Sequence, residues 1–136
     1  MKRLILALLL VPMFARSQQA PLSNRWKLLF EDKTENTKTY IDTQTIEFLD
    51  FFDVQRNVCL CWLRIYSDFS NGIYHDQNDT HLAIALAAKQ FGYKSFTDRK
   101  DGNVTKTNTF IVIKWSDIEP ETNVELILNY CKNLHK

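Results

Sequence analysis

The chain has 136 residues, with 17 lysines and arginines against 16 aspartates and glutamates, so its formal net charge is only +1. This length suits one compact domain, and the 45% of hydrophobic residues suffice for a core. Because the basic residues form neither a surplus nor a continuous stripe, nucleic acid is excluded as a partner.

The first residues have the three-part anatomy of a cleaved secretory signal. Lys2 and Arg3 precede an unbroken apolar run, Leu4–Val11, which is too short to span a bilayer. Small residues, Ala15 and Ser17, stand at the positions that a signal peptidase recognises. The sequence therefore predicts cleavage directly after Ser17.

We accordingly expect residues 1–17 to be a signal peptide and residues 18–136 to form a single domain outside the cytoplasm. Removal of Lys2, Arg3 and Arg16 leaves 14 basic against 16 acidic residues, a net charge of −2. No later apolar run approaches the length of a membrane span, so we expect no transmembrane segment in the mature chain.

The first elements of the mature chain are expected to be short. Residues 26–30 form an apolar run bounded by charges, and residues 39–41 are β-branched or aromatic, so both are predicted as strands. The carboxylate of Asp42 then stands where it would cap a brief helical turn over residues 43–46.

The clearest strand covers residues 54–67. Both of its faces are largely apolar, which predicts a central strand covered on both sides. One face carries Cys59, Cys61, Leu63 and Ile65, and the other carries Val58, Leu60, Trp62, Arg64 and Tyr66. A polar loop is expected to follow over residues 68–80.

Residues 80–92 carry two conflicting patterns. Thr80 as N-cap, an alanine-rich run and Gly92 as C-terminal signal favour a helix. Alternation of Leu82, Ile84 and Leu86 with alanines favours a strand instead. Local sequence leaves both open.

The last third of the chain has firmer signals. Asp101-Gly102-Asn103 predicts a hairpin turn, and residues 110–113 are expected to continue as strand or extended chain. Thr122 and Glu125 have the spacing of a capping box that starts a helix. The apolar stripe of that helix consists of Val124, Ile127, Leu128, Cys131 and Leu134.

Three cysteines in an oxidising compartment predict one disulfide and one spare thiol. The helix stripe directs Cys131 to the core, and Cys59 and Cys61 share one face of a buried strand. We therefore predict that Cys131 pairs with Cys59 or with Cys61. The alternative is that all three are small buried hydrophobic residues that never pair.

Two groups of residues are candidates for a functional site. His75, Asp76, Asp79 and His81 lie within seven residues and have side chains that bind Zn²⁺ or Cu²⁺, but their spacing fits no metal motif, and a solvated loop is the favoured interpretation. No catalytic constellation, metal site or cofactor is therefore expected.

The second group could bind a ligand through aromatic and basic side chains on the long strand. It consists of Arg56, Trp62, Arg64 and Tyr66. The alternative is that each arginine only extends along the edge of the sheet.

An ordered set of short motifs resembles the bacterial surface-adhesin protein E family over essentially the whole mature domain. The motifs are Trp26, the segment Tyr40-Ile41-Asp42-Thr43-Gln44-Thr45-Ile46, Trp62, the turn Asp101-Gly102, the segment Trp115-Ser116-Asp117-Ile118-Glu119-Pro120, and Cys131. The resemblance implies an α+β fold, a curved antiparallel sheet of about five to six strands with a C-terminal helix packed on one face. It also favours a strand for residues 80–92.

One departure concerns the disulfide. The family usually has a cysteine in the middle of the long strand that pairs with the C-terminal one, and this chain has Ala85 near that position. Cys59 or Cys61 would have to take over as the partner of Cys131.

The function expected from these observations is non-enzymatic binding of a protein or small-molecule ligand in the periplasm or at the cell surface. The alternative is a small extracytoplasmic enzyme, or a metal- or haem-handling protein, that uses the loop from His75 to His81.

Overall fold

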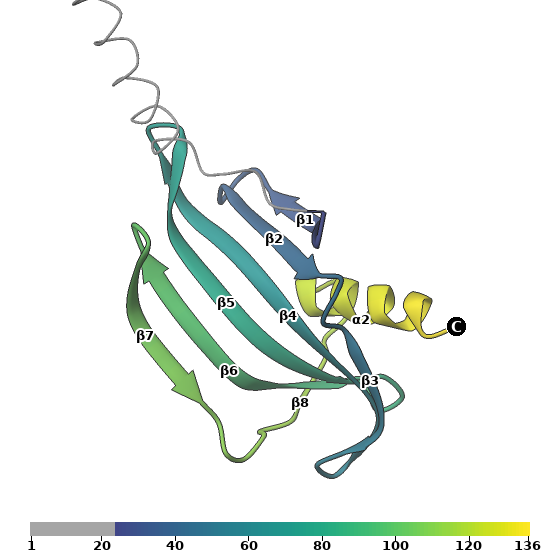
Figure 1. The fold of residues 1–136 in the computed structure, drawn as a ribbon. Helices are drawn as coiled ribbons and strands as arrows, with labels where there is room; N and C mark the ends of the chain where they lie inside the picture. The colour runs from purple at the N-terminus through teal and green to yellow at the C-terminus, as the bar shows by residue number, and fades with distance from the viewer. Residues whose placement is uncertain (1–23) are drawn as a thin grey trace, which may run out of the picture.

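The computed structural model describes residues 24–136, so the predicted signal peptide and its cleavage point lie outside the described residues. One antiparallel sheet forms most of the fold, and a C-terminal helix lies across one of its faces (Figure 1). In sequence order the elements are β1 (Trp26–Asp32), β2 (Thr37–Asp42), β3 (Glu47–Phe52), β4 (Gln55–Ser70), β5 (Ile73–Ala85), β6 (Gln90–Lys100), β7 (Asn103–Thr109), β8 (Ser116–Asp117) and α2 (Asn123–Leu134).

The sheet has eight strands rather than the expected five to six. Its main path runs β1-β2-β4-β5-β6-β7, while β3 pairs with β4 and β8 with β6. Strand β4 is 16 residues long, and this length lets it pair with β2 along residues 63–66 and with β3 along residues 55–60. Strands β3 and β8 therefore pair with the stretches of β4 and β6 that β2 and β7 leave free.

The side chains of β4 alternate between the two faces of the sheet, as the sequence pattern predicted. Cys59, Cys61 and Leu63 are buried on the face that α2 covers, which we call the helix face. Val58 and Leu60 are buried on the opposite, open face, against Leu49, Phe52 and Trp115. Since Val58 and Leu60 are at most 3% exposed, β4 is covered on both sides at this end of the sheet.

The prediction of a polar loop over residues 68–80 is wrong. Strand β4 continues to Ser70, and β5 begins at Ile73 after a tight turn in which Asn71 and Gly72 both have positive φ, 53° and 79°. An Asn-Gly pair is the preferred sequence of such a turn. The polar side chains that suggested a loop lie along a strand whose backbone is paired on both sides, with β4 and with β6.

The strand interpretation of residues 80–92 is correct as far as Ala85, where β5 ends. A turn over residues 86–89 follows, and Gly92 lies within β6 instead of ending a helix. A Cβ atom at Gly92 would stand 2.4 Å from Cγ2 of Ile113. Close approach of the chain therefore explains this glycine.

The remaining local predictions have mixed outcomes. The hairpin turn at Asp101-Gly102 joins β6 to β7 as expected, whereas residues 43–46 form a turn instead of a helical turn. The Asp42 carboxylate nevertheless accepts a hydrogen bond from the Gln44 amide at 3.0 Å. Residues 110–113 lie outside the strands, and Ile111 is 99% exposed.

The C-terminal helix begins where the sequence predicted. Thr122 is the N-cap, and its hydroxyl accepts a hydrogen bond from the Glu125 amide. Ile127, Leu128 and Cys131 are buried against the sheet, but Leu134 at the end of the stripe is 48% exposed. Among the described residues, no helix is long and apolar enough to cross a membrane.

Candidate functional site

A cavity of about 640 Å³ lies on the helix face, between the first turns of α2 and strands β2, β4, β5 and β6. Small-molecule sites in proteins usually have volumes of roughly 300–1,000 Å³. The apolar residues that line it are Phe30, Leu63, Ile65, Leu82, Tyr93, Phe96, Phe110, Val124 and Ile127. The cavity thus has the size and apolar lining of a ligand site.

Alternation along β5 gives this cavity one apolar and one polar end. Leu82, Thr80 and Asn78 are successive residues on the helix face of β5, and all three line the cavity. With a rise of about 3.3 Å per residue, Leu82 and Asn78 are about 13 Å apart along the strand. Polarity therefore increases along the cavity with distance from the buried core.

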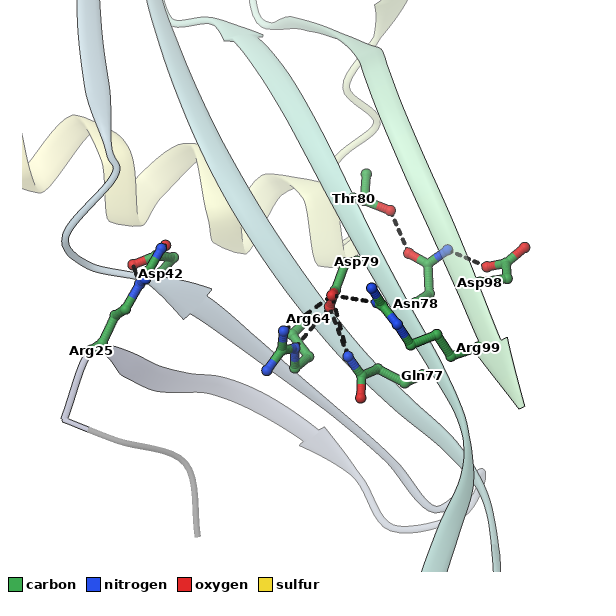
Figure 2. A network of polar contacts seen from close by, with 9 residues as sticks. All are labelled: Arg25, Asp42, Arg64, Gln77, Asn78, Asp79, Thr80, Asp98 and Arg99. Atoms are coloured by element: carbon green, nitrogen blue, oxygen red, sulfur yellow. Dashed lines mark hydrogen bonds and ion pairs between the residues drawn. The ribbon is translucent and has the colours of Figure 1, made fainter. Parts of the chain in front are cut away.

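The polar end contains a short chain of hydrogen bonds, drawn in Figure 2. The Thr80 hydroxyl donates to the side-chain oxygen of Asn78, and the Asn78 amide donates to the Asp98 carboxylate at 2.6 Å. Asp98 reaches the cavity because it pairs with Asn78 across β5 and β6. It carries the single charge among the described residues that line the cavity.

No motif in the sequence indicated this site. Asn78 and Thr80 were assigned to a loop, and Phe96 and Asp98 to no site. The signal lay in the alternation of Asn78, Thr80 and Leu82, which has the period of a strand, but only the pairing of β5 with β6 brings Asp98 beside them.

Trp62, Arg64 and Tyr66, three of the residues predicted to bind a ligand, do share the open face of β4. Arg64 is held by a two-pronged ion pair with Asp79 at 2.8 and 3.0 Å, and its guanidinium lies 4.4 Å from the ring centroid of Trp26. Tyr66 packs edge-on against Tyr40 with ring centroids 6.0 Å apart, and burial raises the pKa of its hydroxyl. These side chains are occupied by contacts within the protein.

Arg56, the fourth predicted residue, does not join this group. It is exposed and pairs with Phe51 at the other end of β4. Eight residues of extended chain separate it from Arg64, about 26 Å. The predicted four-residue patch is therefore not a single site.

A second, smaller cavity of about 190 Å³ lies on the open face near Arg64. Its ionic groups are already paired. Asp79 also accepts a hydrogen bond from Arg99 at 2.9 Å, and Arg25 forms an ion pair with Asp42 (Figure 2). A volume below the usual range and satisfied charges make it a weaker candidate than the cavity under α2.

Asp42, at the rim of this smaller cavity, has a structural role. Burial on its own would raise the pKa of the Asp42 carboxyl, but hydrogen bonds from Arg25, from the Thr45 hydroxyl and from the Gln44 amide lower it to about 2. The carboxylate is thus ionised and ties the start of β1 to the turn after β2.

His75, Asp76, Asp79 and His81 lie on β5 and not on a loop, and they form no common site. Asp76 occupies the helix face, and the three others occupy the open face. His75 pairs with Asp101 at 2.6 Å, while Asp79 pairs with two arginines.

His81 stacks on Trp62, with ring centroids 4.4 Å apart and planes inclined by 11°. Burial, with a smaller contribution from Lys94, lowers the pKa of His81 to about 4. The imidazole is therefore neutral near pH 7 and acts as a packing partner of the indole.

The three cysteines meet in the core, as their placement on strand and helix predicted. Their sulfur atoms lie within 4.8 Å of one another, and those of Cys59 and Cys131 are 3.1 Å apart. Hydrogen bonds from Cys59 and Cys61 lower the pKa of the Cys131 thiol, and the same contact raises the pKa of Cys59. Among the described residues, this is the one cluster of three or more possible metal-ligating groups.

No protein-family model, curated protein or solved structure matches this chain at a significant level. The resemblance to the surface-adhesin protein E family thus stays an expectation, and the cavity under α2 is the feature of this chain that points to a function.

Proposed function

We propose that the chain is an extracytoplasmic, non-enzymatic binding domain that takes a small, largely apolar ligand into the cavity under α2. The observation that supports this proposal is the cavity itself, whose volume of about 640 Å³ suits a small molecule. Its lining is mostly apolar, so a ligand would gain affinity chiefly by removing apolar surface from water.

The elements around the cavity favour binding rather than catalysis. The walls are rigid strands and the first turns of α2, which keep an apolar volume open without a large rearrangement. The polar groups are two amides, hydroxyls and one carboxylate, and such groups orient a ligand through hydrogen bonds. The secretory signal expected at residues 1–17 would place this site outside the cytoplasm.

A neutral fluorescent probe tests the proposal directly. The fluorescence of N-phenyl-1-naphthylamine increases in an apolar site. We expect saturable binding of one molecule per chain, measured by exciting the probe itself, so that the added tryptophans of the variants do not contribute to the signal. The double variant Ile65→Trp/Val124→Trp would fill the cavity from the sheet and from the helix, so it should lose this binding.

The control is Tyr66→Trp/Leu126→Trp, which adds indoles on the same strand and helix but outside the cavity lining. It should bind the probe like the wild type, and circular dichroism would establish that both variants are folded. Absence of probe binding to the wild type, or undiminished binding to the filled variant, would contradict the proposal.

A further inference from the structure

We propose that the ligand of the cavity under α2 is an amphipathic cation, with an apolar chain under the helix and an ammonium group at Asp98. This inference rests on the proposed function, because it assigns a ligand class to the same cavity. Its basis is the match between the charge and shape of the lining and the two parts of such a molecule.

Within residues 24–136, the one charge in the cavity lining is at its polar end. Asp98 lies beside Asn78 at the polar end of the cavity, and no side chain with a positive charge lines the cavity among the described residues. One carboxylate oxygen accepts a hydrogen bond from the Asn78 amide, which orients the group. No ion pair within 4.0 Å involves Asp98 in residues 24–136. A cationic ligand would supply the missing partner.

The cations near Asp98 lie outside the lining of this cavity: Arg99 and Lys100 line a separate pocket beside it, and Lys106 lies on the neighbouring strand. Lys106 on β7 is the cross-strand neighbour of Asp98, but its ammonium lies over the ring of Phe96, 5.5 Å from the centroid. Asp98 is only partly buried, and a flexible lysine pairs weakly with such a carboxylate. Lys106 would therefore compete with the ligand without occupying the cavity.

The hydrogen bonds at the polar end all run in one direction, from donor to acceptor towards Asp98. The Thr80 hydroxyl donates its proton to Asn78, and one N–H of the Asn78 amide is donated to Asp98, so these two donors are directed along the hydrogen-bond chain and end on the carboxylate. The carboxylate oxygens of Asp98 can therefore accept further hydrogen bonds from a ligand in the cavity. An ammonium group has only donors and fits this end, whereas a carboxylate would meet a like charge.

The length of the cavity along β5 limits the length of the ligand. The distance of about 13 Å from Leu82 to Asn78 corresponds to an extended alkyl chain of about ten carbons. The walls along this path are apolar on both sides, with Ile65 and Phe96 from the sheet and Val124 and Ile127 from α2. An alkyl chain can lie there while its head group reaches Asp98.

The experiment compares three probes of equal chain length and different charge: decylammonium, decan-1-ol and decanoate. Titration calorimetry at physiological ionic strength, below micelle-forming concentrations, should give decylammonium at least about tenfold higher affinity than decanoate. Asp98→Asn should reduce this preference to about twofold or less, while Lys106→Met should increase it.

The matched control is Asp76→Asn, which removes one negative charge from the same face of the sheet at a residue that does not line the cavity. It should keep the preference of the wild type, and this would exclude an effect of net charge alone. Equal binding of all three probes, or a preference for decanoate, would overturn the inference and leave the proposed function standing. If none of the probes binds, the proposed function fails as well.

Discussion

The sulfur atoms of Cys59 and Cys131 lie 3.1 Å apart, in a fully buried contact between β4 and α2, although the two residues are 72 positions apart in the chain. This contact connects the only long helix of residues 24–136 to the centre of the sheet. It also distinguishes the two strand cysteines, since the sequence left both as candidates for the partner of Cys131.

We predict that the exported protein has a disulfide between Cys59 and Cys131 and a free thiol at Cys61. Alkylation of the denatured, unreduced chain followed by peptide mass spectrometry should label Cys61 alone. Reduction should lower the free energy of unfolding by up to about 4 kcal/mol, because the bond closes a loop of about 70 residues. Three labelled thiols, or a Cys61–Cys131 peptide, would refute this pairing.

The Asp42 carboxylate should make stability depend on pH in the acid range. Its pKa is about 2 in the folded chain against 3.8 ordinarily, so its contribution is present above about pH 4 and is lost as the pH falls towards 2. We expect a loss of about 1–2 kcal/mol across this range, since Arg25 is partly exposed and solvent weakens the pair.

Urea unfolding at pH 5 and pH 2.5 measures this effect. Asp42→Asn should be less stable than the wild type at pH 5 and should lose less on acidification. Glu35→Gln, an exposed carboxyl near the β1–β2 turn, is the control and should keep the pH dependence of the wild type. Identical acid sensitivity of Asp42→Asn and the wild type would contradict the assigned role.

His81 should contribute a separate pH dependence at higher pH. Its pKa is lowered to about 4, so between about pH 6.5 and 4 the unfolded chain binds a proton that the folded chain does not. Stability should therefore fall as the pH decreases through this window. His81→Phe keeps an aromatic ring on Trp62 and should flatten the dependence, whereas His75→Gln should not. NMR titration gives the check, and an ordinary pKa for His81 would disprove this explanation.

Substitution of Gly92 should destabilise the fold chiefly through a clash with Ile113, with a smaller contribution from the Lys114 carbonyl oxygen, which a Cβ would approach to 3.1 Å. The Cβ of Gly92→Ala would stand 2.4 Å from Cγ2 of Ile113, a branched side chain that cannot move away freely, so we expect a loss of about 1–3 kcal/mol. In an Ile113→Ala background the same change should cost clearly less. A double-mutant cycle from chemical denaturation tests this, and equal costs in both backgrounds would speak against the clash.

The sequence by itself determined the strands and turns whose signals are local. The alternation from Val58 to Leu63 assigned both faces of β4, and the Asp101-Gly102 pair assigned the β6–β7 turn, because side-chain direction and positive φ are properties of neighbouring residues. Thr122 likewise started α2, since a cap needs only the amides that follow it.

Tertiary pairing decided what polarity alone could not. The residues from His75 to Thr80 are polar enough for a loop, and they form a strand because β4 and β6 pair with their backbone on both sides. The pairing of β5 with β6 also places Asp98 beside Asn78. A candidate site built across strands depends on register, which is fixed by contacts between segments distant in sequence, and so the cavity under α2 appeared only in the folded chain.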